Sequence, residues 1–456
     1  MNCTPKIIDI IVKNDLCIGC GLCTYQCPSK ALEMKWNEYG FLTPNLIGTC
    51  DNDGSCISVC PFNPFPIEEV KTEDELATIF LNDASMHHPK IGKYSSLHIG
   101  YSNEYRMTSS SGGIATYILI KLLEMKIIDC VISVRESTNN GNHYEYAISK
   151  TKEEITSGSK TKYYPVTLAN VFSQIDKIEG SVAIVGVGCF IKAIRLAQYS
   201  NPILKNKIKF LVGIICGGVK SSFFSQYLAS KAGVQATAYS NPEFRVKDIN
   251  STASDYSFSC FDKTKNEYKT IKMRSVGDMW GTGLFKNNAC DFCDDVTTEL
   301  ADISLGDAWL PAYDNDGKGN NIIISRSALS KRIINEGIDS KELILNSVSS
   351  ETIISSQQGS FSHRHSGLQY RINKYKKKRK LVPPKRVKQP FFNISFKAVQ
   401  SLRMLVRYKS LVIWSKFPDA VIFENKIKTP LMWLRKMTHI YHIEKRLRNK
   451  IKTFIS

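Results

Sequence analysis

The sequence predicts an α+β protein in three parts: a small cysteine-rich module, a central mixed α/β domain and a basic helical tail. Two cysteine runs, each ending in Cys-Pro, lie close together near the amino terminus. Apolar strand-like stretches then alternate with segments of helical spacing up to about residue 360. Residues 371–456 carry 24 Lys and Arg against 3 Asp and Glu, whereas residues 1–370 hold 37 basic and 39 acidic residues.

The first cysteine run is Cys17-x2-Cys20-x2-Cys23-x3-Cys27-Pro28, which has the ligand spacing of bacterial ferredoxins. The second run is Cys50-x5-Cys56-x3-Cys60-Pro61. In two-cluster ferredoxins the fourth cysteine of each run crosses over to the other cluster. The first 4Fe-4S cluster is therefore predicted to bind to Cys17, Cys20, Cys23 and Cys60. The second is predicted to bind to Cys27, Cys50 and Cys56.

Asp53 stands where the usual spacing places the remaining thiolate of the second cluster. A carboxylate is a harder donor than sulfur and holds iron less firmly. We therefore expect an Asp-ligated 4Fe-4S cluster that readily loses one iron to give a 3Fe-4S form. The alternative is a zinc-binding double knuckle, but zinc sites favour paired Cys-x2-Cys modules over a three-step run ending in Cys-Pro.

Composition limits the class of protein further. With 456 residues the chain is long enough for two or three domains. Residues 1–11 contain neither a long apolar stretch nor a small-residue cleavage site, so we do not expect secretion. The longest apolar stretches, at residues 182–187 and 210–216, are too short to cross a bilayer. Since thiolate clusters need a reducing compartment, a cytoplasmic protein is expected.

Changes in composition predict the domain boundaries. Residues 1–68 form the ferredoxin module, which the Pro-rich segment 61–66 closes. Residues 69–96 form a polar linker with a short helix, residues 97–365 the central domain, and residues 366–456 the basic amphipathic tail.

The central domain contains a predicted strand-helix-strand-helix stretch. The strands are predicted at 182–188 and 210–215, and the helices at 192–199 and 222–232. Cys189 and Cys216 follow the two strands, and the carboxyl ends of parallel strands share one edge of a sheet. Together with Cys290-x2-Cys293 they make a plausible third 4Fe-4S site. By themselves, buried strand cysteines are more often inert small hydrophobes, and the Cys290-Cys293 pair also fits a zinc half-site.

Two polar stretches are candidates for binding phosphate. Ser109-Ser110-Ser111-Gly112-Gly113 precedes an apolar stripe of helical spacing at 114, 118 and 122, so its amides lie at a helix amino terminus. The alternative is a simple N-cap serine. Gly158-Ser159-Lys160 with Lys162 is a second small, cationic stretch that suits a pyrophosphate, although surface loops often look the same.

Taken together and in order, these motifs resemble the beta subunit of coenzyme F(420) hydrogenase/dehydrogenase. They are Ser110-Ser111-Gly112-Gly113, Gly158-Ser159-Lys160, Gly188-Cys189, Cys216-Gly217-Gly218, Cys290-x2-Cys293 and the segment 301–307, Ala-Asp-Ile-Ser-Leu-Gly-Asp. The amino-terminal module is also similar to that of the family, so the resemblance covers roughly residues 1–365.

The resemblance implies an FAD enzyme that passes electrons between iron-sulfur clusters and a two-electron substrate or carrier. The FAD phosphates are expected to bind to Ser110, Ser111, Gly112, Gly113, Ser159, Lys160 and Lys162. Asp307 is a candidate catalytic residue, with an ordinary strand-end aspartate as the alternative. His363 and His365 are expected to be solvated. The alternatives to an enzyme are a non-catalytic electron-transfer subunit of a larger complex and a zinc-stabilised interaction protein.

The tail interleaves Lys and Arg with aromatic residues. This pattern suits the surface of an anionic membrane. It also suits docking of ferredoxin or a similar acidic electron carrier, because opposite charges steer encounter. Nucleic acid is a less favoured partner, since no nucleic-acid fold motif accompanies the charge. The remaining interpretation is a solvated helical cap.

Overall fold

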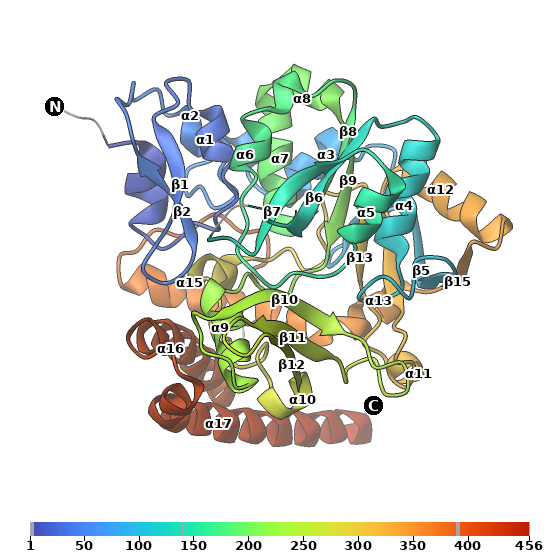
Figure 1. Cartoon of the computed structure of the whole chain (residues 1–456). Helices are drawn as coiled ribbons and strands as arrows, with labels where there is room; N and C mark the ends of the chain where they lie inside the picture. The colour runs from blue at the N-terminus through green and yellow to red at the C-terminus, as the bar shows by residue number, and fades with distance from the viewer. Residues whose placement is uncertain (1–3, 139–140, 389–392, 456) are drawn as a thin grey trace.

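The computed structural model describes residues 4–138, 141–388 and 393–455. Within these ranges an eight-stranded mixed sheet forms the centre of the molecule, and the cysteine-rich module packs at one side of it (Figure 1). The strands lie in the order β15 (Leu343–Ser347), β5 (Ser96–Ser102), β14 (Asn321–Ser325), β13 (Ile303–Asp307), β9 (Ile208–Ile214), β8 (Val182–Val187), β6 (Cys130–Glu136) and β7 (Tyr144–Ser149).

The four inner strands β13, β9, β8 and β6 run parallel, and the outer pairings are antiparallel. Val187 at the end of β8 pairs with Ile214 at the end of β9, and Leu305 of β13 pairs with the same Ile214. The carboxyl ends of these three strands therefore share one edge of the sheet, where open α/β sheets bind ligands.

The strands and helices predicted between residues 182 and 232 agree closely with the structure. Strand β8 covers the predicted residues up to Val187, and β9 begins two residues before the predicted start at Phe210. Helix α9 (Ser222–Lys231) lies where a helix was predicted, with the Ser221 hydroxyl accepting a hydrogen bond from the Phe223 amide at 3.1 Å. Helix α7 (Gly188–Ser200) begins four residues before the prediction, so Cys189 lies in its first turn and not at a strand end.

Helices cover both faces of the central sheet. One face packs against α4 (Ile114–Glu124), α5 (Lys152–Ser157) and α12 (Ala328–Asp339). The other face packs against α7, α3 (Glu73–Phe80) and the cysteine-rich module. Successive side chains of strand β6 point to opposite faces of the sheet. Val131 packs into the core under α4, and Cys130 and Ile132 pack into the core under α7.

The cysteine-rich module is built from short elements. They are η1 (Ile7–Val12), α1 (Leu22–Gln26), β1 (Leu32–Trp36), β2 (Leu42–Leu46) and α2 (Ser55–Ser58). Tyr25 packs edge-on against Phe172 with 5.6 Å between ring centroids, and the Leu168 amide donates to the Cys20 carbonyl at 2.9 Å. These contacts join the module to the central domain around its first cysteine run.

Other short elements connect these layers. They are η2 (Glu68–Val70), β3 (Met86–His88), β4 (Gly92–Tyr94), α6 (Ala169–Phe172), η3 (Ile175–Lys177), α8 (Pro202–Lys207), α10 (Met273–Val276), η4 (Asn288–Phe292), α11 (Pro311–Asp314), α13 (Ser350–Ser356), α14 (Gln358–Phe361) and η5 (Ser362–Ser366). The short helix predicted in the linker is α3, and the Thr72 side chain caps it.

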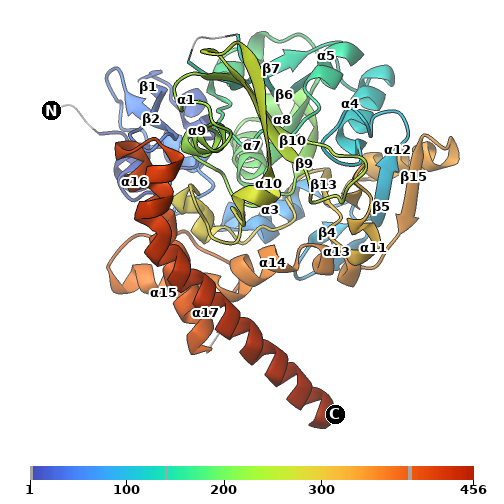
Figure 2. The same ribbon diagram turned by 60° about the horizontal axis from the view of Figure 1, so that its bottom comes forward.

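A second, antiparallel sheet lies beside the C-terminal helices. It contains β10 (Tyr239–Val246), β11 (Ser257–Asp262) and β12 (Glu267–Lys272). The C-terminal helices are α15 (Leu368–Lys377), α16 (Ile394–Lys416) and α17 (Ala420–Ile455). Helix α16 packs antiparallel to α17, whose far end extends past the rest of the molecule (Figure 2). Among the described helices, none combines the length and the apolar character needed to cross a membrane.

Candidate redox site

The first thiol group in the amino-terminal module contains Cys17, Cys20, Cys23 and Cys60. Burial raises the pKa of Cys23 well above its usual value, and the neighbouring thiols Cys20, Cys17 and Cys60 raise it further. The pKa of Cys60 is likewise raised by burial and then by Cys20 and Cys17. The cysteine from the second run thus lies with three from the first run, which is the arrangement that the crossover predicts.

The second thiol group lies nearer the surface of the same module. Burial raises the pKa of Cys56, and Cys27, Asp53 and Cys50 add to the effect. Asp53 is exposed, and Cys50 is partly exposed. Cys56 also contributes to the raised pKa values of Cys23 and Cys60, so the two groups are neighbours.

The third thiol group lies at the shared edge of the parallel strands. Burial raises the pKa of Cys189, followed by the effects of Cys290, Cys293 and Cys216. Cys20 of the first group adds a smaller effect, so the first and third groups are neighbours as well. The three groups therefore form a series from the surface of the module to the edge of the central sheet.

Backbone amides point at two sulfurs of the third group. The Gly218 amide donates to Sγ of Cys216 at 3.2 Å, and the Val219 amide donates to Sγ of Cys290 at 3.3 Å. Hydrogen bonds of this kind stabilise negative charge on a thiolate ligand. In the part of the chain that the structure describes, no three His, Cys, Asp or Glu side chains are arranged to bind a single metal ion.

Arg364 is a buried cation beside the third group, and nothing in the sequence pattern pointed to it. Its guanidinium donates to the Asp295 carbonyl at 2.5 Å and also to the Cys216 carbonyl. Burial alone would lower the pKa of Arg364, but the thiols of Cys293, Cys216 and Cys290 raise it above its usual value. No local sequence pattern distinguishes this arginine from the many others, since it is placed by η5 from far along the chain.

Arginines of helices α15 and α16 in the basic tail bind the Cys290–Cys293 loop. Nε of Arg407 lies 3.1 Å from the Asp291 carboxylate, and Nε of Arg371 donates to the Asp291 carbonyl at 2.8 Å. Nζ of Lys286 lies 2.6 Å from the same carboxylate. Asp291 therefore joins the cysteine loop to both α15 and α16.

Two more basic side chains, from the segment between α15 and α16, form ion pairs near the cysteine loop. Nζ of Lys385 lies 3.0 Å from the Asp294 carboxylate, and Arg386 forms ion pairs with Glu299 and, at 2.8 Å, with Asp74. Lys385 and Arg386 keep only 4% and 11% of their side chains exposed. Part of the tail's positive charge is thus used inside the molecule and is not available to a partner.

The expectation that His363 and His365 are solvated is wrong. His365 is buried, with Nε2 2.9 Å from the Asp294 carbonyl. His363 is largely covered, with Nε2 2.9 Å from Nζ of Lys286. Burial lowers the pKa of His365 to about 4. Both histidines lie in the polar network around the Cys290–Cys293 loop, because helices α15 and α16 pack over this loop.

A cavity of about 580 Å³ adjoins the third thiol group. Cys216, Gly217 and Gly218 form part of its wall. Six of the seven residues expected to bind FAD phosphates also line it: Ser110, Ser111, Gly113, Ser159, Lys160 and Lys162. Its volume lies in the range of known cofactor sites.

Gly112, the seventh residue, is not among the residues that line the cavity. A Cβ atom at Gly112 would stand 2.6 Å from the Gly100 carbonyl oxygen, and one at Gly113 would stand 2.5 Å from the Tyr105 carbonyl carbon. Gly113 also has φ of +81°, a conformation that favours glycine. The two glycines thus allow the turn to pack closely against β5 and its following loop.

The two predicted phosphate-binding stretches lie side by side in the wall of the cavity. The Thr161 amide donates to the Ser110 hydroxyl at 2.9 Å, and the Ser159 hydroxyl donates to the Thr108 carbonyl at 2.8 Å. The first turn of α4, including Ile114, Ala115 and Thr116, lines the cavity too. The Ile114 amide donates to Oδ1 of Asn321 at 3.4 Å, and the dipole of a helix amino terminus favours an anion.

Lys160 and Lys162 of the second stretch have different surroundings. Lys160 is half exposed and forms an ion pair with Glu243. Nζ of Lys162 donates to the Gly158 carbonyl at 2.5 Å, and burial lowers the pKa of Lys162 to about 8. A phosphate group beside Lys162 would favour its charged form.

Aromatic side chains, among them Tyr163, Tyr256, Trp280 and Trp309, also line the cavity. Trp280 lies beside Gly217, since a Cβ atom there would stand 3.0 Å from the indole ring. Nζ of Lys220 lies 4.5 Å from the ring centroid of Trp280 and donates to the carbonyls of Met279 at 2.7 Å and Leu284 at 2.6 Å. Such rings suit a flat conjugated ligand. They were not predicted, because aromatic residues from separate loops carry no local signature.

Asp307, the candidate catalytic residue, also lines the cavity. Its carboxylate forms an ion pair with Arg245, and its carbonyl accepts from Nε2 of Gln357 at 2.9 Å. Burial alone would lower the pKa of Arg245, but Asp307 raises it above its usual value. Asp307 therefore serves in the structure as the counter-ion of a buried arginine.

Profiles of known families match both the central domain and the amino-terminal module. Two profiles of the coenzyme F(420) hydrogenase/dehydrogenase beta subunit match the central domain. The profile of its amino-terminal part matches residues 98–173, and the profile of its carboxyl-terminal part matches residues 179–351. A 4Fe-4S dicluster domain profile matches residues 16–64, which supports iron-sulfur clusters over the zinc double knuckle.

Individual relatives have related names. The F subunit of the F(420)H(2) dehydrogenase from Methanosarcina mazei is 23% identical over 352 residues, which cover 75% of this chain and 87% of the relative. The coenzyme F(420)-dependent sulfite reductase of Methanocaldococcus jannaschii is 23% identical over 357 residues, covering 73% of this chain and 48% of that protein.

A solved structure from the F(420)-reducing NiFe hydrogenase complex of Methanosarcina barkeri covers 62% of this chain and 94% of its own, with 18% identity and a TM-score of 0.47. The family profiles together span more than half of the sequence, and they confirm the resemblance read from the motifs. The chain therefore belongs to the family of coenzyme F(420) hydrogenase/dehydrogenase beta subunits, which are iron-sulfur electron-transfer oxidoreductases, and carries an amino-terminal 4Fe-4S dicluster domain.

Proposed function

We propose that this chain is an iron-sulfur flavoprotein that transfers electrons between 4Fe-4S clusters and FAD, and so reduces or oxidises a two-electron substrate or carrier. The observation that carries the proposal is the series of three neighbouring thiol groups that ends at a cofactor-sized cavity. Bound clusters supply one-electron transfer, and bound FAD supplies the conversion between one-electron and two-electron chemistry.

The thiol groups fit three clusters in number and arrangement. In a ferredoxin domain of residues 1–68, the ligands are Cys17, Cys20, Cys23 and Cys60 for the first cluster and Cys27, Cys50, Asp53 and Cys56 for the second. In a central domain of residues 97–365, the third cluster binds to Cys189, Cys216, Cys290 and Cys293. Residues 69–96 link the two domains, and residues 366–456 form the tail.

The cavity fits FAD by the chemistry of its lining, which combines cationic and hydroxyl groups with aromatic rings. The amino terminus of α4, Ser110, Ser111, Gly113, Ser159, Lys160 and Lys162 bind the pyrophosphate, and Gly112 keeps their turn close to β5. The aromatic side chains around Trp280, which lies beside Gly217, hold the isoalloxazine ring. Lys220 and the Arg245–Asp307 pair place fixed charges around that ring.

Three kinds of partner follow from this proposal. Some relatives are named as subunits of an F(420)H(2) dehydrogenase and of a coenzyme F(420) hydrogenase, which supports protein partners in a larger complex. Ferredoxin or a similar acidic carrier is the proposed one-electron partner, and it meets the second thiol group, where Asp53 is exposed. The two-electron partner is F(420) or another small molecule. Because such clusters need a reducing compartment, the cytoplasm is the proposed location.

The alternative is an electron-transfer subunit without turnover of its own, which the names of the relatives favour. Anaerobic mixing of the isolated chain with reduced F(420) or with reduced ferredoxin tests both. Flavin and cluster absorption should bleach with at least one donor. Repeated turnover between one reduced donor and the oxidised form of the other carrier identifies an enzyme, and a single reduction without turnover identifies an electron-transfer subunit. If neither donor changes the absorption, the proposed function is wrong.

Asp53→Cys should make the second cluster resistant to air. A thiolate holds iron more firmly than a carboxylate, so the variant should keep its fourth iron during aerobic isolation. EPR spectra of the natural chain should then show a 3Fe-4S signal that the variant lacks. The control is Asp51→Cys, which adds a thiol two residues away and should leave the signal unchanged. Equal 3Fe-4S signals in the natural chain and in Asp53→Cys would rule out Asp53 as a ligand.

Arg364→Gln should lower the reduction potential of the third cluster, because the reduced cluster loses a nearby positive charge. The shift is on the order of 100 mV, as for one unit charge a few ångströms away in an effective dielectric of about 20. Arg364→Lys keeps the charge and should show a smaller shift. EPR-monitored redox titration gives both values. If the Gln and Lys variants shifted equally, Arg364 would act through its hydrogen bonds and not through its charge.

A further inference from the structure

Helix α17 uses one face to pack against the molecule. Phe423, Ile427 and Leu434 are buried on this face. The Phe423 ring lies 5.0 Å from that of Phe285 and 5.3 Å from that of Tyr227, measured between centroids. Further along the helix, Tyr441 is partly buried and lies 4.9 Å from Phe396 of α16. These contacts fix the orientation of the helix, so the direction of its opposite face is set as well.

The opposite face of α17 carries a second apolar stripe, which is exposed. Counting 100° per residue, its members fall within one sector of the helix that points away from the packed face. They are Ile422, Trp433, Ile440, Ile443 and Leu447. Trp433 is 50% exposed and Leu447 is 56% exposed. An outward stripe of this length is not explained by the packing of the chain itself.

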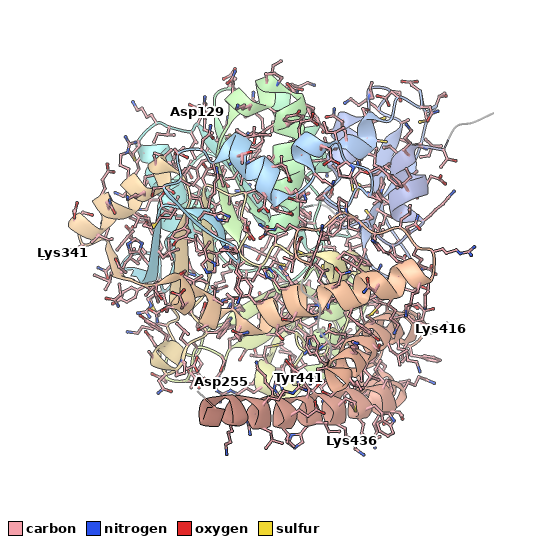
Figure 3. The ribbon with its side chains drawn as sticks, turned by 180° about the vertical axis from the view of Figure 1, so that it is seen from behind. Asp129, Asp255, Lys341, Lys416, Lys436 and Tyr441 are labelled. Atoms are coloured by element: carbon pink, nitrogen blue, oxygen red, sulfur yellow. The ribbon has the colours of Figure 1, made fainter. Side chains whose placement is uncertain are left out.

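Most basic side chains of α17 lie within or beside the outward stripe, and by the same count of 100° per residue Lys445 and Arg448 fall toward the packed face. Residues 420–450 contain eight Lys and Arg against two Glu. Both glutamates are paired, Glu424 with Lys231 at 2.8 Å and Glu444 with Arg448 at 3.3 Å. The lysine nearest the tryptophan, Lys436, lies with Nζ 5.4 Å from the Trp433 ring. Figure 3 shows Lys436 on the outward side of α17 and Tyr441 on the side toward the body.

We propose that the outward face of α17, defined by Ile422, Trp433, Ile440, Ile443 and Leu447 with their flanking Lys and Arg, binds the surface of an anionic membrane. A helix with an apolar face, a tryptophan at its centre and basic flanks lies in the plane of the lipid headgroups. The lysines and arginines then meet anionic headgroups, while the apolar side chains enter the acyl boundary. The helix does not span the bilayer, and the rest of the molecule stays outside it.

Charge decides between a membrane and a second copy of the chain. Two α17 helices pressed together along this face would bring their Lys and Arg side chains close to each other, and like charges that meet at an interface disfavour the complex. An anionic lipid surface meets the same rows with opposite charge. This binding adds to the proposed redox function and does not depend on it.

Vesicle flotation of the purified full chain tests the proposal. The chain should float with phosphatidylcholine vesicles that contain phosphatidylglycerol, and much less with phosphatidylcholine alone. Added salt should weaken the binding, as expected for charged headgroups. The double variant Trp433→Ser/Ile440→Ser should bind at least about tenfold more weakly, because two apolar side chains no longer enter the lipid.

The matched control is Ile203→Ser/Ile344→Ser, which removes two exposed apolar side chains from other faces and should bind like the natural chain. Cluster absorption of each variant reports that the protein is folded. The proposal is overturned if the natural chain does not float with anionic vesicles or if the α17 double variant floats equally well. It is also overturned if that variant instead dissociates an oligomer seen without vesicles.

Discussion

Cys290→Ala is expected to stop electron transfer between the amino-terminal module and the bound flavin. Cys290 is the proposed ligand of the third cluster, which lies between the first thiol group and the cavity. Its loss should remove about four iron atoms per chain and leave the two clusters of the module in place. Stopped-flow mixing with reduced ferredoxin should then bleach the module's clusters, while flavin reduction falls to the background rate.

Cys130→Ala and Cys260→Ala are the matched controls. Both cysteines are fully buried, Cys130 in β6 and Cys260 in β11, and neither is a proposed ligand. Their replacement should change neither the iron content nor the rate of flavin reduction. Rapid flavin reduction in Cys290→Ala, with about four irons missing, would show that electrons reach the cavity without the third cluster.

Ala115→Asp is expected to abolish FAD binding while the clusters remain. Ala115 lines the cavity in the first turn of α4, beside the residues proposed to bind the pyrophosphate. An aspartate stabilises the amino terminus of a helix, so the fold should tolerate it. The same carboxylate faces the pyrophosphate, and such like-charge contact costs several kcal/mol, which weakens binding about a hundredfold or more.

The measurement is the flavin content per chain and the dissociation constant of FAD by fluorescence. Ala115→Ser, which adds a small neutral group at the same position, is the control and should bind FAD nearly as well as the natural chain. Equal FAD affinity in the Asp and Ser variants would show that the pyrophosphate binds elsewhere.

The neighbours of each thiol could be predicted from the sequence because ligand spacing is a local property, and the binding of clusters by these residues stays a prediction. The runs from Cys17 to Cys27 and from Cys50 to Cys60 allow one crossover arrangement, and the thiol neighbours in the structure agree with it. The third group required a further step. It depended on the rule that the ends of adjacent parallel strands meet, and the pairing of Val187 with Ile214 confirms that they do.

The residues that the sequence missed are those brought in from distant segments. Arg364, Arg245 and Trp280 reach the site from η5, β10 and a loop, and nothing in their own neighbourhoods indicates this. The tail was misleading for a similar reason. Lys385 and Arg386 look solvated in a basic stretch, yet their carboxylate partners Asp294 and Glu299 lie near residue 295 and become visible only in the folded chain.

The most direct test of the whole account is anaerobic purification of the full chain, with iron, sulfide and flavin counted per polypeptide. The account predicts about twelve iron and twelve sulfide ions, from three 4Fe-4S clusters, together with about one FAD. A preparation that contains zinc without iron, or that remains without iron and flavin after anaerobic reconstitution, would contradict it.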